Sequence, residues 1–93
     1  MAKLIITAAL TGAEVTRDDN PNLPISPEEL AEAAYECYRA GASIVHLHAR
    51  NDDQSSTQAA EVYREIINLI QARCNLIVQV STGGAVGMSA EER

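Results

Sequence analysis

Two histidines separated by one residue, His46 and His48, are the side chains in this sequence best suited to metal chemistry. Residues two apart on a β-strand point to the same face, with Cα atoms about 6.6 Å apart at ~3.3 Å per residue. Two imidazoles placed in this way can converge on one Zn²⁺ ion, whose Zn–N bonds are ~2.0–2.1 Å long. As core residues, the two rings would need several hydrogen-bond partners where water is scarce. The spacing therefore predicts a metal site at His46 and His48.

Two imidazoles do not complete a catalytic zinc site, which usually takes three protein ligands and leaves one position open. Glu14 is a candidate third ligand because it follows the first predicted strand, and loops after parallel strands gather at one edge of a sheet. A solvated loop carboxylate is the simpler interpretation of Glu14, and the sequence pattern by itself favours it.

The glycine-rich segment Ser81–Gly87 places a third set of polar groups at the same edge. The adjacent glycines Gly83 and Gly84 allow close backbone approach, and successive N–H groups beside a hydroxyl can bind an anion. The segment matches neither a dinucleotide-binding fingerprint nor a P-loop, since no lysine follows the glycines. A plain turn and an anion-binding loop both remain open.

The elements that must position these groups follow from the hydrophobic pattern. Buried strands are expected at 4–9, 43–48 and 76–80, with a long polar loop at 10–25. One helix begins at the capping box Ser26–Glu29, and the second at a cap among Ser55, Ser56 and Thr57. The apolar stripes of the two helices are Leu30, Ala33, Ala34 and Cys37, and Val62, Ile66, Leu69 and Ile70.

The order strand–helix–strand–helix–strand predicts right-handed βαβ crossovers and a parallel sheet. Two helices cannot cover both faces of such a sheet. A second capping box, Ser89–Glu92, predicts the start of a further helix. We therefore expect an α/β fold in which residues 1–93 form one partial domain without an internal boundary. That domain would be the N-terminal β-α-β-α-β part of a (β/α)₈ TIM barrel.

The net charge of the chain bears on its binding partners, and its hydropathy bears on its location in the cell. Seven Lys and Arg against thirteen Asp and Glu give a formal net charge of −6, which argues against nucleic acid or an anionic membrane as partner. The apolar run at the start of the chain is too short for a signal peptide or a membrane span. We expect a cytoplasmic protein.

These segments together resemble the β-keto acid cleavage enzyme family. The likeness rests on Ile6–Glu14, Pro21–Glu29, Ala40–Ala42, His46–Arg50 and Gln79–Gly87, which occur in this order over nearly the whole chain. It reaches the first third of the family's length. The resemblance implies a zinc-dependent TIM barrel that condenses a β-keto acid with acetyl-CoA to give acetoacetate and a new acyl-CoA. Gln54–Thr57 departs from the family pattern, in which a glycine is expected near the start of that loop.

The resemblance also implies roles for single residues. His46 and His48 would bind zinc, with a glutamate on a later strand as third ligand. Ser81 and Gly84 would hold the substrate carboxylate. Glu14 would pair with the substrate's amine, which indicates 5-amino-3-oxohexanoate as the substrate and 3-aminobutanoyl-CoA as a product, as in lysine fermentation.

Other parts of the machinery are expected outside this sequence. Arg50 matches a recurrent family position without an assigned role, and we assign no catalytic acid or base within residues 1–93. Those residues and most of the coenzyme A site would lie beyond Arg93. We therefore expect the 93-residue chain alone to be inactive, and the intact protein to be a homo-oligomer of four subunits by the same resemblance.

Two other functions fit part of the pattern. Another zinc TIM barrel, a hydrolase or lyase, can also use a His-x-His pair, but there the pair usually ends the first strand. The second alternative is a non-catalytic fragment that serves as an interaction or scaffold unit. Intact mass separates this second alternative from a complete barrel of about 250 residues, which weighs ~30 kDa.

Overall fold

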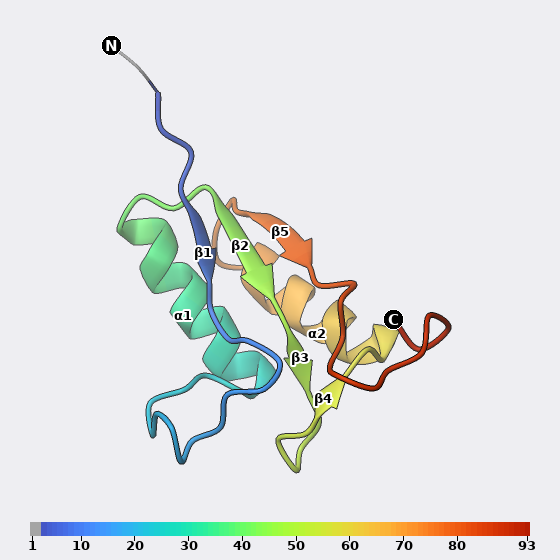
Figure 1. Cartoon of the computed structure of the whole chain (residues 1–93). Coiled ribbons are helices and arrows are strands. Elements are labelled where there is room, and N and C mark those ends of the chain that lie inside the picture. Colours follow the sequence, from blue (N-terminus) through green and yellow to red (C-terminus); the bar gives the residue numbers. More distant parts are fainter. Residues whose placement is uncertain (1–2) are drawn as a thin grey trace.

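The computed structural model describes residues 3–93, which form two helices and five strands (Figure 1). The elements are β1 (Thr7–Ala9), α1 (Pro27–Arg39), β2 (Ile44–Leu47), β3 (Ala49–Arg50), β4 (Ser56–Thr57), α2 (Ala60–Gln71) and β5 (Ile77–Val80). Strands β1, β2 and β5 form a parallel sheet with β2 in the centre. This topology confirms the predicted α/β class and is consistent with part of a TIM-barrel-type domain.

Helix α1 begins at the capping box that the sequence predicts. The Ser26 hydroxyl accepts a hydrogen bond from the Glu29 N–H, and the Glu29 carboxylate accepts one from the Ser26 N–H. Gly41 follows the helix at a φ of 115°, a conformation that favours glycine and ends the helix. The buried residues are Leu30, Ala31 and Ala34, whereas the predicted stripe members Ala33 and Cys37 are only half-buried.

Helix α2 lacks the side-chain cap that was predicted among Ser55, Ser56 and Thr57. Its N-cap is Ala59, which makes no side-chain capping bond. The prediction is wrong because an antiparallel hairpin intervenes: Ser56 and Thr57 form β4, paired with β3. The Thr57 hydroxyl instead accepts a hydrogen bond from the Ala59 N–H and so orders the turn before the helix.

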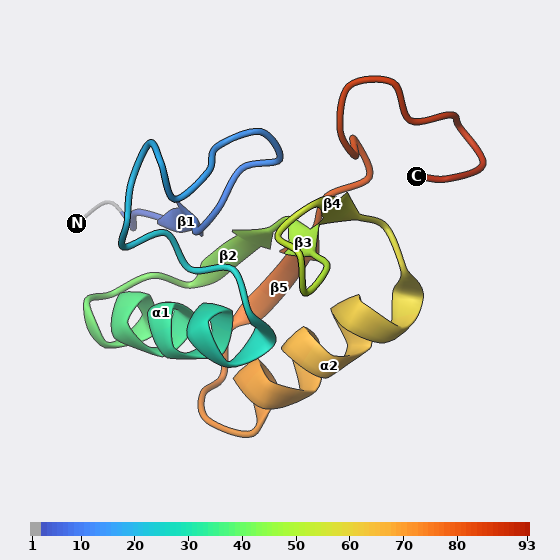
Figure 2. The same cartoon turned by 90° about the horizontal axis from the view of Figure 1, so that it is seen from below.

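The hydrophobic core lies between the two helices and one face of the parallel sheet. Figure 2 shows α1 and α2 side by side beneath the sheet. The largest fully buried side chains are Leu30, Val45, Leu47, Ile66 and Ile70. Tyr63 of α2 is also buried, although the predicted stripe omitted it, and its predicted neighbours Val62 and Leu69 are half-buried. Both helices therefore cover the same face.

The first strand is shorter and more exposed than predicted. Only Thr7–Ala9 pair with β2, while Leu4 and Ile5 before them are 82% and 73% exposed. The reason is that β1 has one neighbouring strand, and only Ala8 packs against the core.

Within residues 3–93, no helix is both long and apolar enough to cross a bilayer.

Candidate metal and substrate site

The structure brings the rings of His46 and His48 together on one face of the sheet. Their centroids lie 5.3 Å apart, with the ring planes at 70°. Val45 and Leu47 alternate with the histidines and are fully buried on the helix side of the sheet. The histidines therefore lie on the face that α1 and α2 leave uncovered, at the carboxyl end of the central strand.

Gln79 holds the ring of His46 from the neighbouring strand. The parallel register pairs His46 of β2 with Gln79 of β5, and the His46 Nδ1 lies 2.7 Å from the Gln79 Oε1. A carbonyl oxygen only accepts, so this contact favours the tautomer with its proton on Nδ1. The Nε2 lone pair then remains available to a metal, as metal-binding histidines generally require. Sequence reasoning missed Gln79, although the register of adjacent parallel strands could have indicated it.

The environment of His48 favours its neutral form. Partial burial lowers the pKa of His48 below its ordinary value, and the nearby charges of His46 and Arg50 lower it further. A neutral imidazole is the form that binds a metal. The His48 ring is therefore available as a neutral ligand.

Glu14 contacts the glycine-rich segment and does not form a three-ligand metal site with His46 and His48. Its Oε1 accepts a hydrogen bond of 3.1 Å from the Val86 N–H. Among residues 3–93, the structure groups no three His, Cys, Asp or Glu side chains in a way that could hold a metal. The two histidines are therefore an incomplete ligand set, and Glu14 supplies a carboxylate to a different part of the same edge.

The segment after β5 is held by hydrogen bonds within itself and to neighbouring segments. Ser81 is buried, its N–H donates to the Leu47 carbonyl, and its hydroxyl accepts from the Gly83 N–H. Gly84 has a φ of 64°, and a Cβ there would lie 2.7 Å from the Met88 sulfur. The predicted site residues Ser81 and Gly84 thus lie in a tight turn. Glu14 contacts the same segment through its hydrogen bond with the Val86 N–H.

The capping box predicted at Ser89–Glu92 forms, but the helix predicted after it is not seen in the described residues. Ser89 and Glu92 exchange the two hydrogen bonds of a capping box. No helix is assigned between Ser89 and Arg93.

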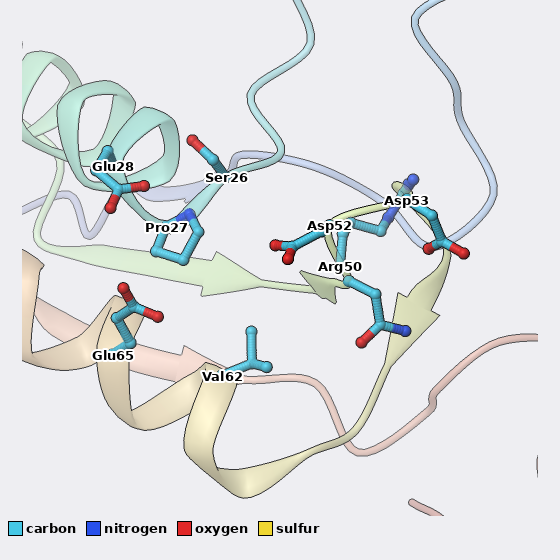
Figure 3. A pocket seen from close by; sticks show the side chains of 9 residues that line it. Ser26, Pro27, Glu28, Arg50, Asp52, Asp53, Val62 and Glu65 are labelled. Carbon is cyan, nitrogen blue, oxygen red and sulfur yellow. The ribbon is translucent and has the colours of Figure 1, made fainter.

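A pocket lies elsewhere, between the first turns of α1 and α2 and the turn that joins β3 to β4 (Figure 3). Its volume is about 590 Å³. In Figure 3, Glu28 of α1 and Glu65 of α2 face each other across it, with Asp52 and Asp53 on the hairpin turn. This acidic pocket is on the helix side of the sheet, so it is separate from the histidine pair.

The described residues thus combine a parallel α/β sheet, a histidine pair at the carboxyl end of its central strand and a glycine-rich turn. Residues 3–93 match the family described as beta-keto acid cleavage enzyme, and the chain belongs to this family. The resemblance inferred from the sequence is confirmed.

Three curated relatives are similar to the chain. It is 54% identical over 94 residues to a 3-keto-5-aminohexanoate cleavage enzyme of Fusobacterium nucleatum, covering 100% of the chain and 35% of that enzyme. The enzyme of the same description from Acetoanaerobium sticklandii is 52% identical over 94 residues, covering 100% of the chain and 34% of that enzyme. A 3,5-dioxohexanoate:acetyl-CoA acetone transferase of Paraburkholderia graminis is 41% identical over 92 residues, covering 98% of the chain and 30% of that enzyme. The chain thus spans about a third of the length of these relatives.

Proposed function

We propose that the protein containing this chain is a zinc-dependent β-keto acid cleavage enzyme with a (β/α)₈ barrel fold. Its substrates would be 5-amino-3-oxohexanoate and acetyl-CoA, and its products acetoacetate and 3-aminobutanoyl-CoA. The observation that carries this proposal is the contact of Glu14 with Val86, which brings a carboxylate to the segment that bears Ser81 and Gly84. The two relatives above 50% identity, which are described as acting on the amino substrate, support the same choice.

His46 and His48 would hold the metal ion. Their shared face, the neutral state favoured at His48 and the contact of His46 with Gln79 all fit an imidazole-binding cation. When bound, Zn²⁺ would supply Lewis-acid stabilisation of negative charge developing on a substrate oxygen. The third ligand would come from a part of the protein outside this sequence, and residues 1–93 alone would be inactive for that reason.

The chain's own residues would bind the two ends of the substrate. Ser81 and Gly84 would hold the carboxylate of the keto acid close to the backbone of the tight turn. The Glu14 carboxylate would accept hydrogen bonds from the ammonium group at the far end, since Val86 donates only one of the several bonds that a carboxylate can accept. Separate recognition of the two ends would align the carbon chain beside the metal.

A β-keto acid whose far end is uncharged would not use Glu14 in this way. The Paraburkholderia graminis relative, described as acting on 3,5-dioxohexanoate, is less similar to the chain than the two relatives described by the amino substrate. The Glu14 carboxylate would gain no charge-assisted hydrogen bond from the uncharged end of such a substrate. The choice between the two substrates therefore depends on this side chain.

The test is a steady-state assay of the full-length protein with acetyl-CoA and three keto acids: 5-amino-3-oxohexanoate, 3,5-dioxohexanoate and 3-oxohexanoate. The proposal expects the highest kcat/KM with the amino substrate, and loss of turnover when zinc is removed and not replaced. Equal kcat/KM with all three substrates would overturn the substrate choice. Full turnover by protein shown to be free of metal would overturn the zinc dependence.

A further inference from the structure

Two side chains of the β3–β4 hairpin bind the backbone of the loop that carries Glu14. The Arg50 Nη2 donates to the carbonyl of Gly12 at 2.6 Å and to that of Val15 at 2.8 Å. The Ser56 hydroxyl donates to the carbonyl of Ala13 at 2.7 Å. Three carbonyls within four consecutive residues are therefore held from one hairpin, on both sides of Glu14.

The two donors are themselves held together by the hairpin. Arg50 of β3 and Ser56 of β4 are direct partners across the antiparallel ladder. The turn between these strands is closed by Gln54, whose φ of 74° lies in the left-handed region. The Gln54 carbonyl accepts a bond of 2.9 Å from the Arg50 Nη1, so the turn also orients the guanidinium.

Arg50 occupies an unusual environment for a cation. It is only 5% exposed, and within residues 3–93 its guanidinium donates to carbonyl oxygens rather than to a carboxylate. Burying a charge is costly unless hydrogen bonds compensate it. The Nε atom is buried and has no partner among the described residues. An arginine in this position is hard to explain as ordinary packing, because its hydrogen bonds go to the backbone around Glu14 and to its own turn.

Glu14 extends from this held loop to a distant segment. Its carboxylate accepts the Val86 N–H across 72 positions of sequence. Glu14 itself is exposed, and the hydrogen bonds to the carbonyls of its neighbours Gly12, Ala13 and Val15 hold the backbone from which its side chain extends. Without those bonds, the exposed loop would sample several conformations, and its carboxylate would lose a defined position.

We propose that Arg50 and Ser56 are positioning residues that hold the Glu14 carboxylate against the glycine-rich segment, where it recognises the ammonium end of the substrate. This inference rests on the proposed function for the role of Glu14. The positioning itself is a property of the hairpin and the loop. The hairpin thereby acts as a specificity element, although neither of its two donors need touch the substrate.

Three variants of the full-length protein test the inference by kinetics: Arg50→Lys, Ser56→Ala and, as a matched control, Ser55→Ala. Ser55 lies next to Ser56, but its hydroxyl bonds only within the turn, to Asp53 and Asn51. Arg50→Lys keeps the charge but loses the planar set of donors that spans several carbonyls. We expect Arg50→Lys and Ser56→Ala to lower kcat/KM for 5-amino-3-oxohexanoate by about 2- to 10-fold, mainly through KM, as for the loss of one hydrogen bond. The kcat/KM of these two variants for 3-oxohexanoate should change by less than that. The control variant Ser55→Ala should change by less than that with either substrate.

Hydrogen–deuterium exchange provides a readout that needs neither substrate nor metal. In Arg50→Lys and Ser56→Ala, peptides covering 12–16 and 82–88 should exchange faster than in the unsubstituted protein, by about 2- to 10-fold at the Val86 amide. Glu14→Gln should speed exchange of 82–88 alone. Ser56→Ala is the milder change and decides the result if Arg50→Lys does not fold.

The outcomes separate the two proposals. If exchange is unchanged in Ser56→Ala, the hairpin does not position Glu14 and the inference is overturned. If exchange rises but both substrates lose turnover equally, Arg50 and Ser56 have a general structural role and the specificity claim is overturned. A third outcome is that exchange rises but Glu14→Gln changes kcat/KM equally for the amino and non-amino substrates. The proposed recognition of the ammonium group then fails, and only the positioning of Glu14 stands.

Discussion

The Gln79 side chain of β5 holds the imidazole of His46 on β2, with 2.7 Å between the Gln79 Oε1 and the His46 Nδ1. The two residues are register partners in the parallel sheet. A bond of this kind orients a ring and selects its tautomer before any metal arrives. It therefore links the strand pairing of the fold to the chemistry of the histidine pair.

Replacing Gln79 should weaken zinc binding without removing a ligand. In the full-length protein, Gln79→Leu should raise the zinc dissociation constant about 10- to 100-fold, as is typical when a ligand loses its hydrogen-bond partner. Competition with a fluorescent zinc chelator measures this change. Gln79→Glu keeps an acceptor at the same place and should stay near the original affinity. Equal weakening by both substitutions would show that the contact does not orient the ring.

Removing either histidine should abolish zinc occupancy and turnover together. His46→Ala and His48→Ala each delete one of the two ligands that this chain would provide, so a stable site would not form. Metal analysis of the purified full-length variants, alongside the acetoacetate assay, measures both properties. Full zinc content in either variant would contradict the ligand assignment, even if activity were lost.

Replacing Glu14 should reduce activity selectively on the amino substrate. Glu14→Gln removes the charge while keeping the size of the side chain, and a charge-assisted contact is worth ~1.5–3 kcal/mol. We expect kcat/KM for 5-amino-3-oxohexanoate to fall roughly 10- to 150-fold. Turnover of 3-oxohexanoate should be unchanged. A similar loss on both substrates would place Glu14 in the metal or catalytic shell instead.

The capping box of α1 should make stability depend on pH through Glu29. Hydrogen bonds from Ser26 and the charge of Arg17 lower the pKa of Glu29 below its ordinary value of 4.5. A carboxylate with a lowered pKa binds fewer protons folded than unfolded, so its contribution is present above about pH 4.5 and is lost as the pH falls through the lowered pKa. Urea unfolding at several pH values should show a smaller acid-dependent loss in Glu29→Gln than in the unsubstituted chain.

Two further substitutions complete that experiment. Ser26→Ala should lower the free energy of unfolding at neutral pH by about 1 kcal/mol, because it removes the acceptor for the Glu29 N–H. Glu28→Gln is the matched control, since Glu28 lies on the same turn but takes no part in the capping box. A pH profile in Glu29→Gln that matches the unsubstituted chain would contradict the assignment.

Local features of this protein could be predicted from the sequence because they depend on neighbours a few residues apart. The capping box at Ser26 and Glu29, the helix end at Gly41 and the shared face of His46 and His48 are of this kind. Each follows from the period of a helix or strand, or from one side chain bonding to nearby backbone. The same local patterns carried the family resemblance, which the comparison over residues 3–93 confirms.

The contacts that organise the site were decided only by the tertiary structure. Gln79 reaches His46 because the parallel register sets those two residues opposite one another, and Glu14 reaches Val86 because the loops after β1 and β5 meet at one edge of the sheet. The hairpin that displaces the expected cap of α2 also places Arg50 against the Glu14 loop. No periodicity within a segment encodes such pairings, since they arise when crossovers and buried faces bring distant segments together.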